Sequence, residues 1–323
     1  MVASPSGERA ADNPTRRGTA LRLIAGNRQT VVGLCALGAF AVVALLAPVI
    51  APTPVNTQFS NSFAAPAAAH PLGLDGGGFD VLSRLVHGAQ TSLLVGLIAA
   101  LVGMLIGGTV GFVAGYFGGR TDGVLMRITD YFLVIPDIPL MIVAAAVFGQ
   151  SLTNIMIVIG LVYWASTARL IRAQVMSVRQ RTFVKRVEAM GASPFFVLTR
   201  HVVPQVTPLL LANTVLMVAN AIFAETYISF LGLGDPSVVS WGRMIQDALD
   251  QGAVVAGAWW VVLPPGLAVT LVVLAATVAG QGMEDTLNPR LKVGHLAVRR
   301  FRVRPLHGAL DRPRAIHGAL ERP

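Results

Sequence analysis

The chain has 323 residues, of which 54% are hydrophobic and 13% are charged, and its formal net charge is +9. Soluble domains are on average about 45–50% apolar and about 25% charged, so the composition excludes an ordinary soluble domain and indicates several membrane spans. The basic residues lie between apolar runs and form no continuous face, which argues against a nucleic-acid partner.

Six apolar segments approach the length of about 20 residues that a helix needs to cross a bilayer core of about 30 Å. They predict an all-α membrane protein with six transmembrane helices, at roughly 31–51, 91–115, 127–148, 152–169, 206–230 and 259–280. The fourth is marginal, because SLTNIMIVIGLVYWAST mixes polar and apolar residues. Residues 1–30 are polar, basic and too long for a signal peptide, and are interpreted as a cytoplasmic N-terminal arm.

Lysine and arginine are divided unevenly between the two sides of these segments. The predicted external loops, 52–90 and 231–258, contain only Arg84 and Arg243 but hold five aspartates. All other Lys and Arg residues fall on the opposite side. The positive-inside rule therefore predicts that both termini face the cytoplasm.

The second segment has a glycine at every fourth position. Small residues at this spacing share one helix face and let another helix approach closely in lipid. Packing inside the chain is the favoured interpretation, and a subunit interface or a lining of the translocation path are the alternatives. The glycines are Gly103, Gly107, Gly111 and Gly115.

Two carboxylates fall within predicted spans. Asp137 lies about ten residues into the third segment, which is about 15 Å deep by helical rise. An ionisable residue at that depth is a candidate functional residue, with local capping of a helix loosened by Pro136 and Pro139 as the alternative. Glu225 lies near the outer end of the fifth segment, where we expect it to reach water or the interface.

The largest predicted inner loop, 170–205, is polar and interrupted by a glycine. A helix is predicted to continue as far as Met190 and to end at Gly191. A second helix is predicted after it, with Ser193 as its N-cap and Pro194 in its first turn. The loop is consistent with a basic amphipathic segment on anionic headgroups or with a docking element for a soluble partner. No recognition motif supports a nucleic-acid patch.

Motifs for independent chemistry do not occur in the sequence. Neither of the two lysines, Lys185 and Lys292, belongs to a G-x-x-x-x-G-K-[ST] phosphate-binding loop. The six histidines lack metal-ligand spacing, and the single cysteine, Cys35, excludes an intrachain disulfide and a cysteine-based metal site. We therefore expect no catalytic residue, no metal site and no enzyme activity in this chain.

Several long motifs give the chain a family resemblance over about 30–292. The inner loop resembles the cytoplasmic signature of ATP-binding-cassette importer permeases, which is EAA, three residues and G. The other motifs look like those of the C-type permease of dipeptide, oligopeptide and nickel importers. They are HPLGLDGGGFDVLSRLVHGAQTSLLVGL (70–97), AGYFGGRTDGVLMRITDYFLVIP (114–136), AETYISFLGLGDPSVVSWGRMI (224–245) and AWWVVLPPGLAVTLVVLAATVAGQGMEDTLNPRLK (258–292).

The resemblance implies a six-helix transmembrane domain of a type I importer in the bacterial inner membrane. Its implied partners are a homologous B-type permease, two cytoplasmic ATPase subunits that hold ATP and Mg, and an extracytoplasmic solute-binding protein. It implies a peptide as solute, with nickel or another small solute as the alternative, and no cofactor in this chain. The opposing class is a secondary transporter or channel that works without an ATPase.

By the same resemblance, the inner loop is a coupling helix that transmits closure of the ATPase. Gly191 is the signature glycine, whereas the EAA positions fall on Lys185, Arg186 and Val187, which is a departure from the family pattern. Glu188 follows the expected glutamate position by about one turn. The residues expected at the ATPase are Glu188, Ala189, Gly191, Ala192, Ser193, Pro194 and Phe195.

The resulting division of the chain has four parts. They are the arm 1–30, the first transmembrane helix with its external loop 31–90, a five-helix permease core 91–288, and a basic cytoplasmic tail 289–323. The tail repeats HGALDRP as HGALERP, lies outside the resemblance and is expected to be disordered. The external motifs 70–75 and 229–241 are expected either to support docking of the binding protein or to pack the outer loops.

Overall fold

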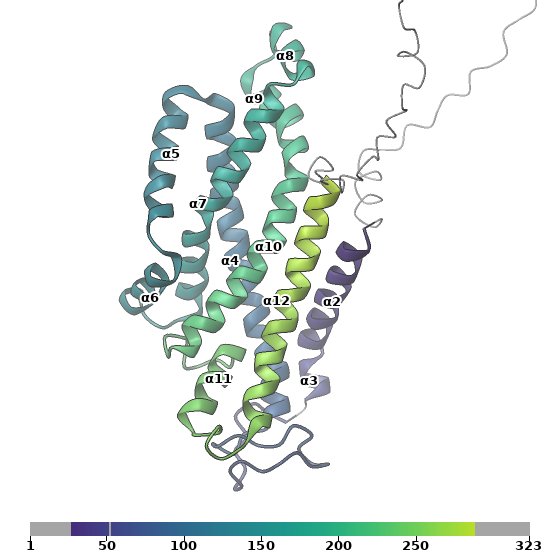
Figure 1. Cartoon of the computed structure of the whole chain (residues 1–323), viewed down its shortest axis with the longest axis vertical. Helices are drawn as coiled ribbons and strands as arrows, with labels where there is room; N and C mark the ends of the chain where they lie inside the picture. The colour runs from purple at the N-terminus through teal and green to yellow at the C-terminus, as the bar shows by residue number, and fades with distance from the viewer. Residues whose placement is uncertain (1–26, 52, 288–323) are drawn as a thin grey trace, which may run out of the picture. The chain divides into compact units, whose positions relative to one another are not determined.

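The computed structural model describes residues 27–51 and 53–287, and within them it contains helices and no strand. The arm up to residue 26 and the tail 289–323 lie outside the described residues. The long helices run side by side, joined by shorter ones at both ends (Figure 1). In chain order they are α2 (Arg28–Leu45), α3 (Ala47–Ile50), α4 (Val81–Phe117), α5 (Gly119–Val134), α6 (Asp137–Phe148), α7 (Leu152–Arg179), α8 (Thr182–Ala189), α9 (Pro194–Val197), the π-helix η1 (Leu198–Val202), α10 (Val203–Phe230), α11 (Trp241–Asp250) and α12 (Trp259–Leu287).

Five of the described helices are long and apolar enough to cross a membrane, and a sixth span exists if α5 and α6 are counted as one. The prediction of one continuous helix over 127–148 is wrong, because α5 and α6 meet at an angle of 88°. The break falls at Ile135 and Pro136, both in extended conformation. Proline has no amide hydrogen and disfavours a helical residue before it, which explains the position of the break.

Several helices extend beyond the apolar segments that predicted them. The second segment, predicted at 91–115, is part of α4, whose 37 residues make it about 55 Å long, well beyond the bilayer core. Asp80 caps its start by accepting a hydrogen bond from the Ser83 amide at 2.8 Å. Gly118, with φ +67°, ends it. Apolar residues therefore predicted where the long helix α4 lies, whereas its caps determine where it begins and ends.

The four-residue glycine repeat of α4 lies against α7. A Cβ atom on Gly111 would lie 2.7 Å from the carbonyl oxygen of Ala168, and one on Gly115 would lie 2.8 Å from that of Arg172. In return, a Cβ on Gly160 of α7 would lie 2.7 Å from the Cβ of Val102. The absence of side chains at these positions lets the two backbones approach to a distance that any substitution would disturb.

The predicted inner and outer segments lie at opposite ends of the bundle. The start of α2, the end of α12 and the α8–α9 segment lie at one end, whereas α11 and the loop 53–80 lie at the other (Figure 1). The helix α11 was not predicted and covers the outer ends of α4 and α10. Arg84 of α4 joins this layer to the loop, with ion pairs to Asp75 at 2.7 Å and Asp247 at 3.3 Å.

Candidate functional site

The segment 180–203 forms a helix, a break and a second helix at one end of the bundle. The prediction that a helix continues unbroken to Met190 is wrong, because α7 ends at Arg179 and α8 begins at Thr182. Arg181 adopts an extended conformation and caps α8 without a side-chain hydrogen bond. The sequence has no glycine or proline here, so the local signal for this break is weak.

Gly191 ends α8 in a left-handed conformation. Its φ is +82°, its amide donates to the carbonyl of Glu188 at 3.0 Å, and the next amide, of Ala192, donates to that of Val187 at 3.4 Å. This pair of hydrogen bonds is a Schellman motif, which favours glycine at this position. A Cβ on Gly191 would meet nothing within 4 Å, so the requirement for glycine is conformational within this chain.

The second helix begins as predicted at Ser193 and Pro194. The Ser193 hydroxyl accepts a hydrogen bond from the Phe196 amide at 3.4 Å, and Pro194 occupies the first turn of α9. The chain then continues through η1 into α10 without a break. The α8–α9 segment is thereby joined directly to two long helices, α7 on one side and α10 on the other.

The inner face of this segment is anchored in an apolar cluster. Val184 of α8 and Val197 of α9 are both fully buried. They belong to one cluster with residues of α4, α7, η1 and α10, namely Tyr116, Ile171, Val175, Val178, Leu198, Val202 and Val206. Burial of such side chains contributes about 1.5–3 kcal/mol each, so the segment is held as a part of the bundle.

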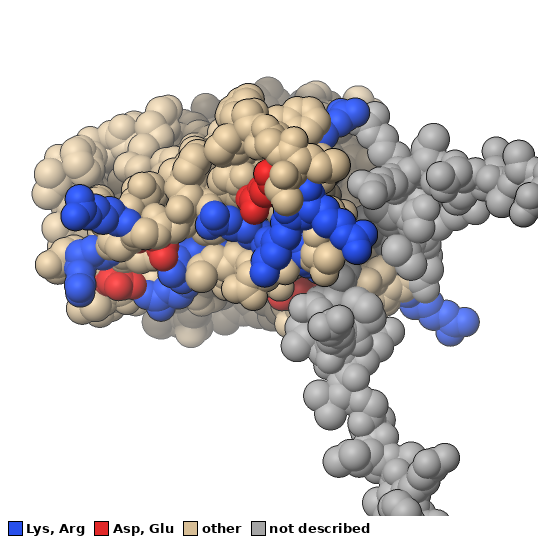
Figure 2. Space-filling view, turned by 90° about the horizontal axis from the view of Figure 1, so that it is seen from above, with Lys and Arg blue, Asp and Glu red and all other residues tan. Residues whose placement is uncertain are grey.

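The outer face of the segment exposes large apolar side chains beside basic ones. Met190 is 77% exposed, Phe195 74% and Phe196 48%. Lys185 and Arg186 of α8 are exposed as well. Figure 2 looks onto this end and shows Lys and Arg side chains gathered over it, with fewer Asp and Glu. An exposed apolar group with a polar rim is typical of an interaction site.

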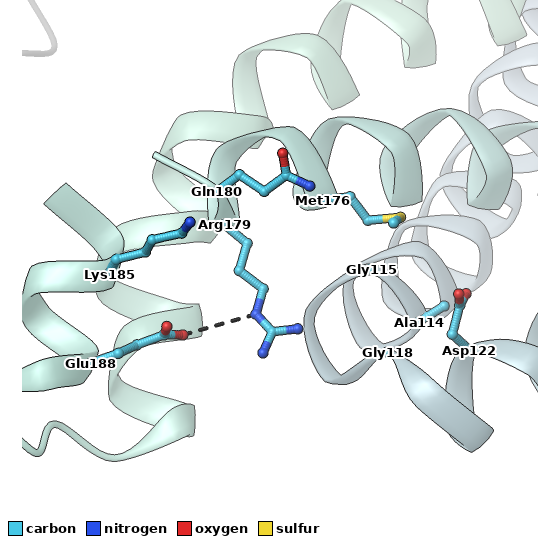
Figure 3. A pocket seen from close by; sticks show the side chains of 9 residues that line it. All are labelled: Ala114, Gly115, Gly118, Asp122, Met176, Arg179, Gln180, Lys185 and Glu188. Carbon is cyan, nitrogen blue, oxygen red and sulfur yellow. Dashed lines mark ion pairs between the residues drawn. The ribbon is translucent and has the colours of Figure 1, made fainter. Parts of the chain in front are cut away.

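The residues at the signature positions face different surroundings. Arg186 is exposed, Val187 is partly buried against the apolar cluster, and Lys185 is exposed at the rim of a pocket that it lines together with Glu188. Glu188 turns toward the bundle and lines a pocket of about 300 Å³ between α4, α5, α7 and α8 (Figure 3). Its Oε1 accepts a hydrogen bond from the Tyr116 hydroxyl at 3.4 Å and lies 3.9 Å from Nε of Arg179.

Asp137 and Glu225 lie apart from this segment. Asp137 is the first residue of α6, exposed at the break, and has no hydrogen bond or ion pair to another described residue. It therefore does not lie ten residues into a continuous helix, as predicted. A carboxylate in the first turn is stabilised by the helix dipole.

Glu225 is 1% exposed, so the expectation that it reaches water is wrong. Its carboxylate accepts hydrogen bonds from the hydroxyls of Ser229 at 2.8 Å and Ser92 at 3.4 Å. The Trp241 amide at the start of α11 donates to Ser92 at 3.2 Å. The unpredicted helix α11 therefore covers the site that the sequence suggested was open.

The outer motif 229–241 is tied to the start of α7. Asp235 accepts hydrogen bonds from the amides of Leu152 and Ser237, both at 2.9 Å, and from the Ser237 hydroxyl at 2.6 Å. Burial raises the pKa of Asp235, but these hydrogen bonds outweigh it and hold the pKa below its usual value. Packing of the outer loops accounts for these contacts.

Three arginines of α7 form contacts that the sequence analysis missed. Arg172 pairs with Asp122 of α5 through two hydrogen bonds of 2.5 Å, and Arg169 pairs with Asp130 at 2.7 Å. Arg179 lies beside Glu188 and over the Tyr116 ring, 5.3 Å from its centroid. The sequence signal for these pairs was the eight-residue separation of Asp122 and Asp130, which places both on one helix face.

Across residues 27–51 and 53–287, no three His, Cys, Asp or Glu side chains form a group that could hold a metal ion.

Comparison with known proteins finds sequence similarity to one family and to several of its members. The family of binding-protein-dependent transport system inner membrane components matches residues 107–293. The dipeptide transport system permease protein DppC of Escherichia coli K12 is 39% identical over 274 residues, covering 82% of this chain and 90% of its own. DppC of Bacillus subtilis is 34% identical over 275 residues, covering 84% and 85%, and DppC of Alkalihalophilus pseudofirmus is 33% identical over 290, covering 89% and 94%.

The family match covers α5 to α12, including the α8–α9 segment and the outer motif 229–241, and the DppC matches each cover more than four-fifths of the chain. They agree with the helical fold and with the family suggested by the sequence motifs. The chain is thus a multi-pass membrane protein and belongs to the family of binding-protein-dependent transport system inner membrane components, the permeases of ATP-binding-cassette importers.

Proposed function

We propose that this chain is one permease subunit of an ATP-driven importer for dipeptides or short peptides. It forms half of the translocation path together with a homologous B-type permease. Two cytoplasmic ATPase subunits bind ATP and Mg, and an extracytoplasmic protein delivers the solute. The similarity to three dipeptide permeases over more than four-fifths of the chain supports the choice of solute.

Within this assembly, α8 and α9 are the coupling helix that docks on an ATPase subunit. The observation that carries this proposal is the exposed apolar group of Met190, Phe195 and Phe196 on a segment anchored by Val184 and Val197. A segment that is fixed on one face and exposes apolar groups on the other is suited to receive a movement and pass it to the bundle. Both termini are then cytoplasmic, as the distribution of Lys and Arg also favours.

The source of energy has to lie outside this segment. Moving a two-state protein from 1:99 to 99:1 requires about 5.5 kcal/mol of differential binding. We expect that seating one short segment in a cleft supplies less than this amount, so closure of an ATPase pair around ATP provides the rest. The permeases then alternate between inward-facing and outward-facing states, and the outward-facing state receives the solute.

Replacement of Gly191 by valine tests the coupling role. A matched control is Gly252, which follows α11 at the opposite end, has φ +75°, makes the same pair of hydrogen bonds, and has nothing within 4 Å of its Cβ position. Both variants introduce a β-branched residue in a left-handed conformation, so both carry the same backbone strain.

The measurement is ATP hydrolysis by the importer in proteoliposomes, with and without binding protein purified with its own ligand. We expect Gly191→Val to lower the stimulated rate by about tenfold, and Gly252→Val to leave it within about twofold of the wild type. Equal rates for the two variants would count against α8–α9 as the coupling element. Uptake without any ATPase subunit would favour a secondary transporter instead.

The solute is decided by a separate experiment. Mass spectrometry of the ligand that co-purifies with the binding protein distinguishes a peptide from a nickel complex or another small solute. A peptide is the expected result. Detection of a nickel complex would change only the proposed solute, and the proposed roles of the permease and its coupling helix would stand.

A further inference from the structure

We propose that Glu188, Arg179 and Tyr116 form an internal link that holds the far end of α8 against α4 and α7, so that movement of α8 is transmitted to the spans. This inference rests on the proposed function, because it assigns Glu188 a positioning role within the coupling helix. In this role Glu188 faces its own bundle and does not contact the ATPase.

The contacts of the link converge on one oxygen atom. Oε1 of Glu188 accepts from the Tyr116 hydroxyl at 3.4 Å and lies 3.9 Å from Nε of Arg179. The guanidinium of Arg179 lies over the ring of Tyr116. The three side chains come from α8, α7 and α4, and Figure 3 shows Glu188 extending from α8 toward Arg179 at the edge of the pocket.

The position of Glu188 along α8 makes this contact effective. Only Gln180 and Arg181 separate α7 from α8, so this short break is the natural hinge. Val184 and Glu188 are four residues apart and share one face of α8. Val184 and the partly buried Val187 hold α8 in the apolar cluster, and Glu188 adds a polar attachment to α4 and α7 at its far end, which sets the orientation of α8 about the hinge.

The helix that receives the link is also tied to the broken span. Arg172 and Arg169 of α7 pair with Asp122 and Asp130 of α5. A displacement of α8 that moves α7 therefore also moves α5, which leads into the break before α6. Ion pairs on one helix thus connect the candidate docking surface to the part of the bundle that departs most from a straight span.

The link is suited to positioning and contributes little to folding. The side chain of Glu188 is 34% exposed and that of Arg179 is 43% exposed, and partly exposed ion pairs contribute little to stability. Substitution of Glu188 should therefore leave the chain folded and in its complex. This separation between stability and coupling makes the inference testable.

The experiment uses the complete importer in proteoliposomes and compares Glu188→Ala, Arg179→Glu, Glu188→Arg and the double variant that combines the last two. The control is Glu284→Ala, which removes a partly buried glutamate of α12 that has no hydrogen bond or ion pair to another described residue. Two quantities are measured: the ATPase subunits that co-purify, and the ratio of ATP hydrolysis with binding protein to that without.

We expect Glu188→Ala to lower this ratio by about fivefold while the ATPase subunits still co-purify, and Glu284→Ala to change neither quantity. The double variant should recover at least about half of the ratio, because the charges are exchanged and the pair is restored. An unchanged ratio in Glu188→Ala, or a double variant no better than its single variants, would overturn the link.

Loss of the ATPase subunits from Glu188→Ala would also overturn it, since that result assigns Glu188 a direct contact with the partner. Failure of the proposed function looks different. In that case Gly191→Val and Glu188→Ala both leave the stimulated rate unchanged, whereas failure of the link alone leaves the Gly191→Val defect in place.

Discussion

Glu225 is the clearest case in which the surroundings of one residue determine its role. A carboxylate in a span is costly unless hydrogen bonds satisfy it, and here two serine hydroxyls do so. Ser229 lies one turn away on α10, whereas Ser92 comes from α4 and also accepts from the first amide of α11. Glu225 therefore joins three helices at the outer end, and packing is the interpretation that its burial supports.

Replacing Glu225 by alanine should destabilise the folded chain. Alanine leaves the hydroxyls of Ser92 and Ser229 buried without their acceptor, at a cost of about 1–3 kcal/mol. Thermal unfolding in detergent, followed by tryptophan fluorescence, should show a lower midpoint for Glu225→Ala than for the wild type. The exposed Asp285→Ala serves as the control. A midpoint for Glu225→Ala equal to that of the control would show that the serines find other partners.

At the scale of elements, the contact between α4 and α7 depends on which face each glycine occupies. Gly111 faces the α7 backbone at a distance that leaves no room for a methyl group. Gly108 lies three residues earlier, and a Cβ there would meet only the end of the Leu210 side chain, at 3.4 Å. Two glycines on one helix thus differ in whether they can be replaced.

Alanine substitution at these two positions should have opposite effects. Gly111→Ala forces α4 and α7 apart and should destabilise the chain by about 1–3 kcal/mol. Gly108→Ala should be neutral or stabilising by up to about 1 kcal/mol, since alanine favours the helix more than glycine does. Thermal unfolding in detergent provides the comparison. A Gly111→Ala variant as stable as Gly108→Ala would contradict the close packing.

The sequence predicted those elements whose signals are local. The end of α8 at Gly191 and the start of α9 at Ser193 and Pro194 each depend on a residue with a marked backbone preference. The break between α7 and α8 was missed because burial of Val184 against other helices, a tertiary effect, favours it. Pro136 marked a weakness in the third span, but no local pattern specifies a bend of 88°.

The helix α11 and the partners of Glu188 were missed for related reasons. Residues 241–250 form a short amphipathic helix inside a polar connection. The sequence alone does not show that its apolar face packs against α4 and α10. Likewise, Tyr116 and Glu188 are 72 residues apart in the chain. Such contacts depend on the packing of α4 against α7, which the glycine repeat indicates without specifying the partner helix.

At the scale of the whole described bundle, charge and connectivity agree on two distinct ends. The α8–α9 end carries gathered Lys and Arg side chains, and both described ends of the chain reach it (Figures 1 and 2). At the other end, both arginines, Arg84 and Arg243, are paired with aspartates. Lys and Arg residues are enriched on the cytoplasmic side of membrane proteins, so the α8–α9 end is expected to face the cytoplasm.

Cysteine labelling tests this orientation directly. Cys35 is first replaced by alanine, because it is an exposed free thiol. Single cysteines are then placed at Thr182 in α8 and at Ala68 in the outer loop, both exposed. A membrane-impermeant maleimide should label Ala68→Cys in right-side-out vesicles and Thr182→Cys in inside-out vesicles. The reverse pattern would place α8 and α9 on the external side, where no ATPase can reach them.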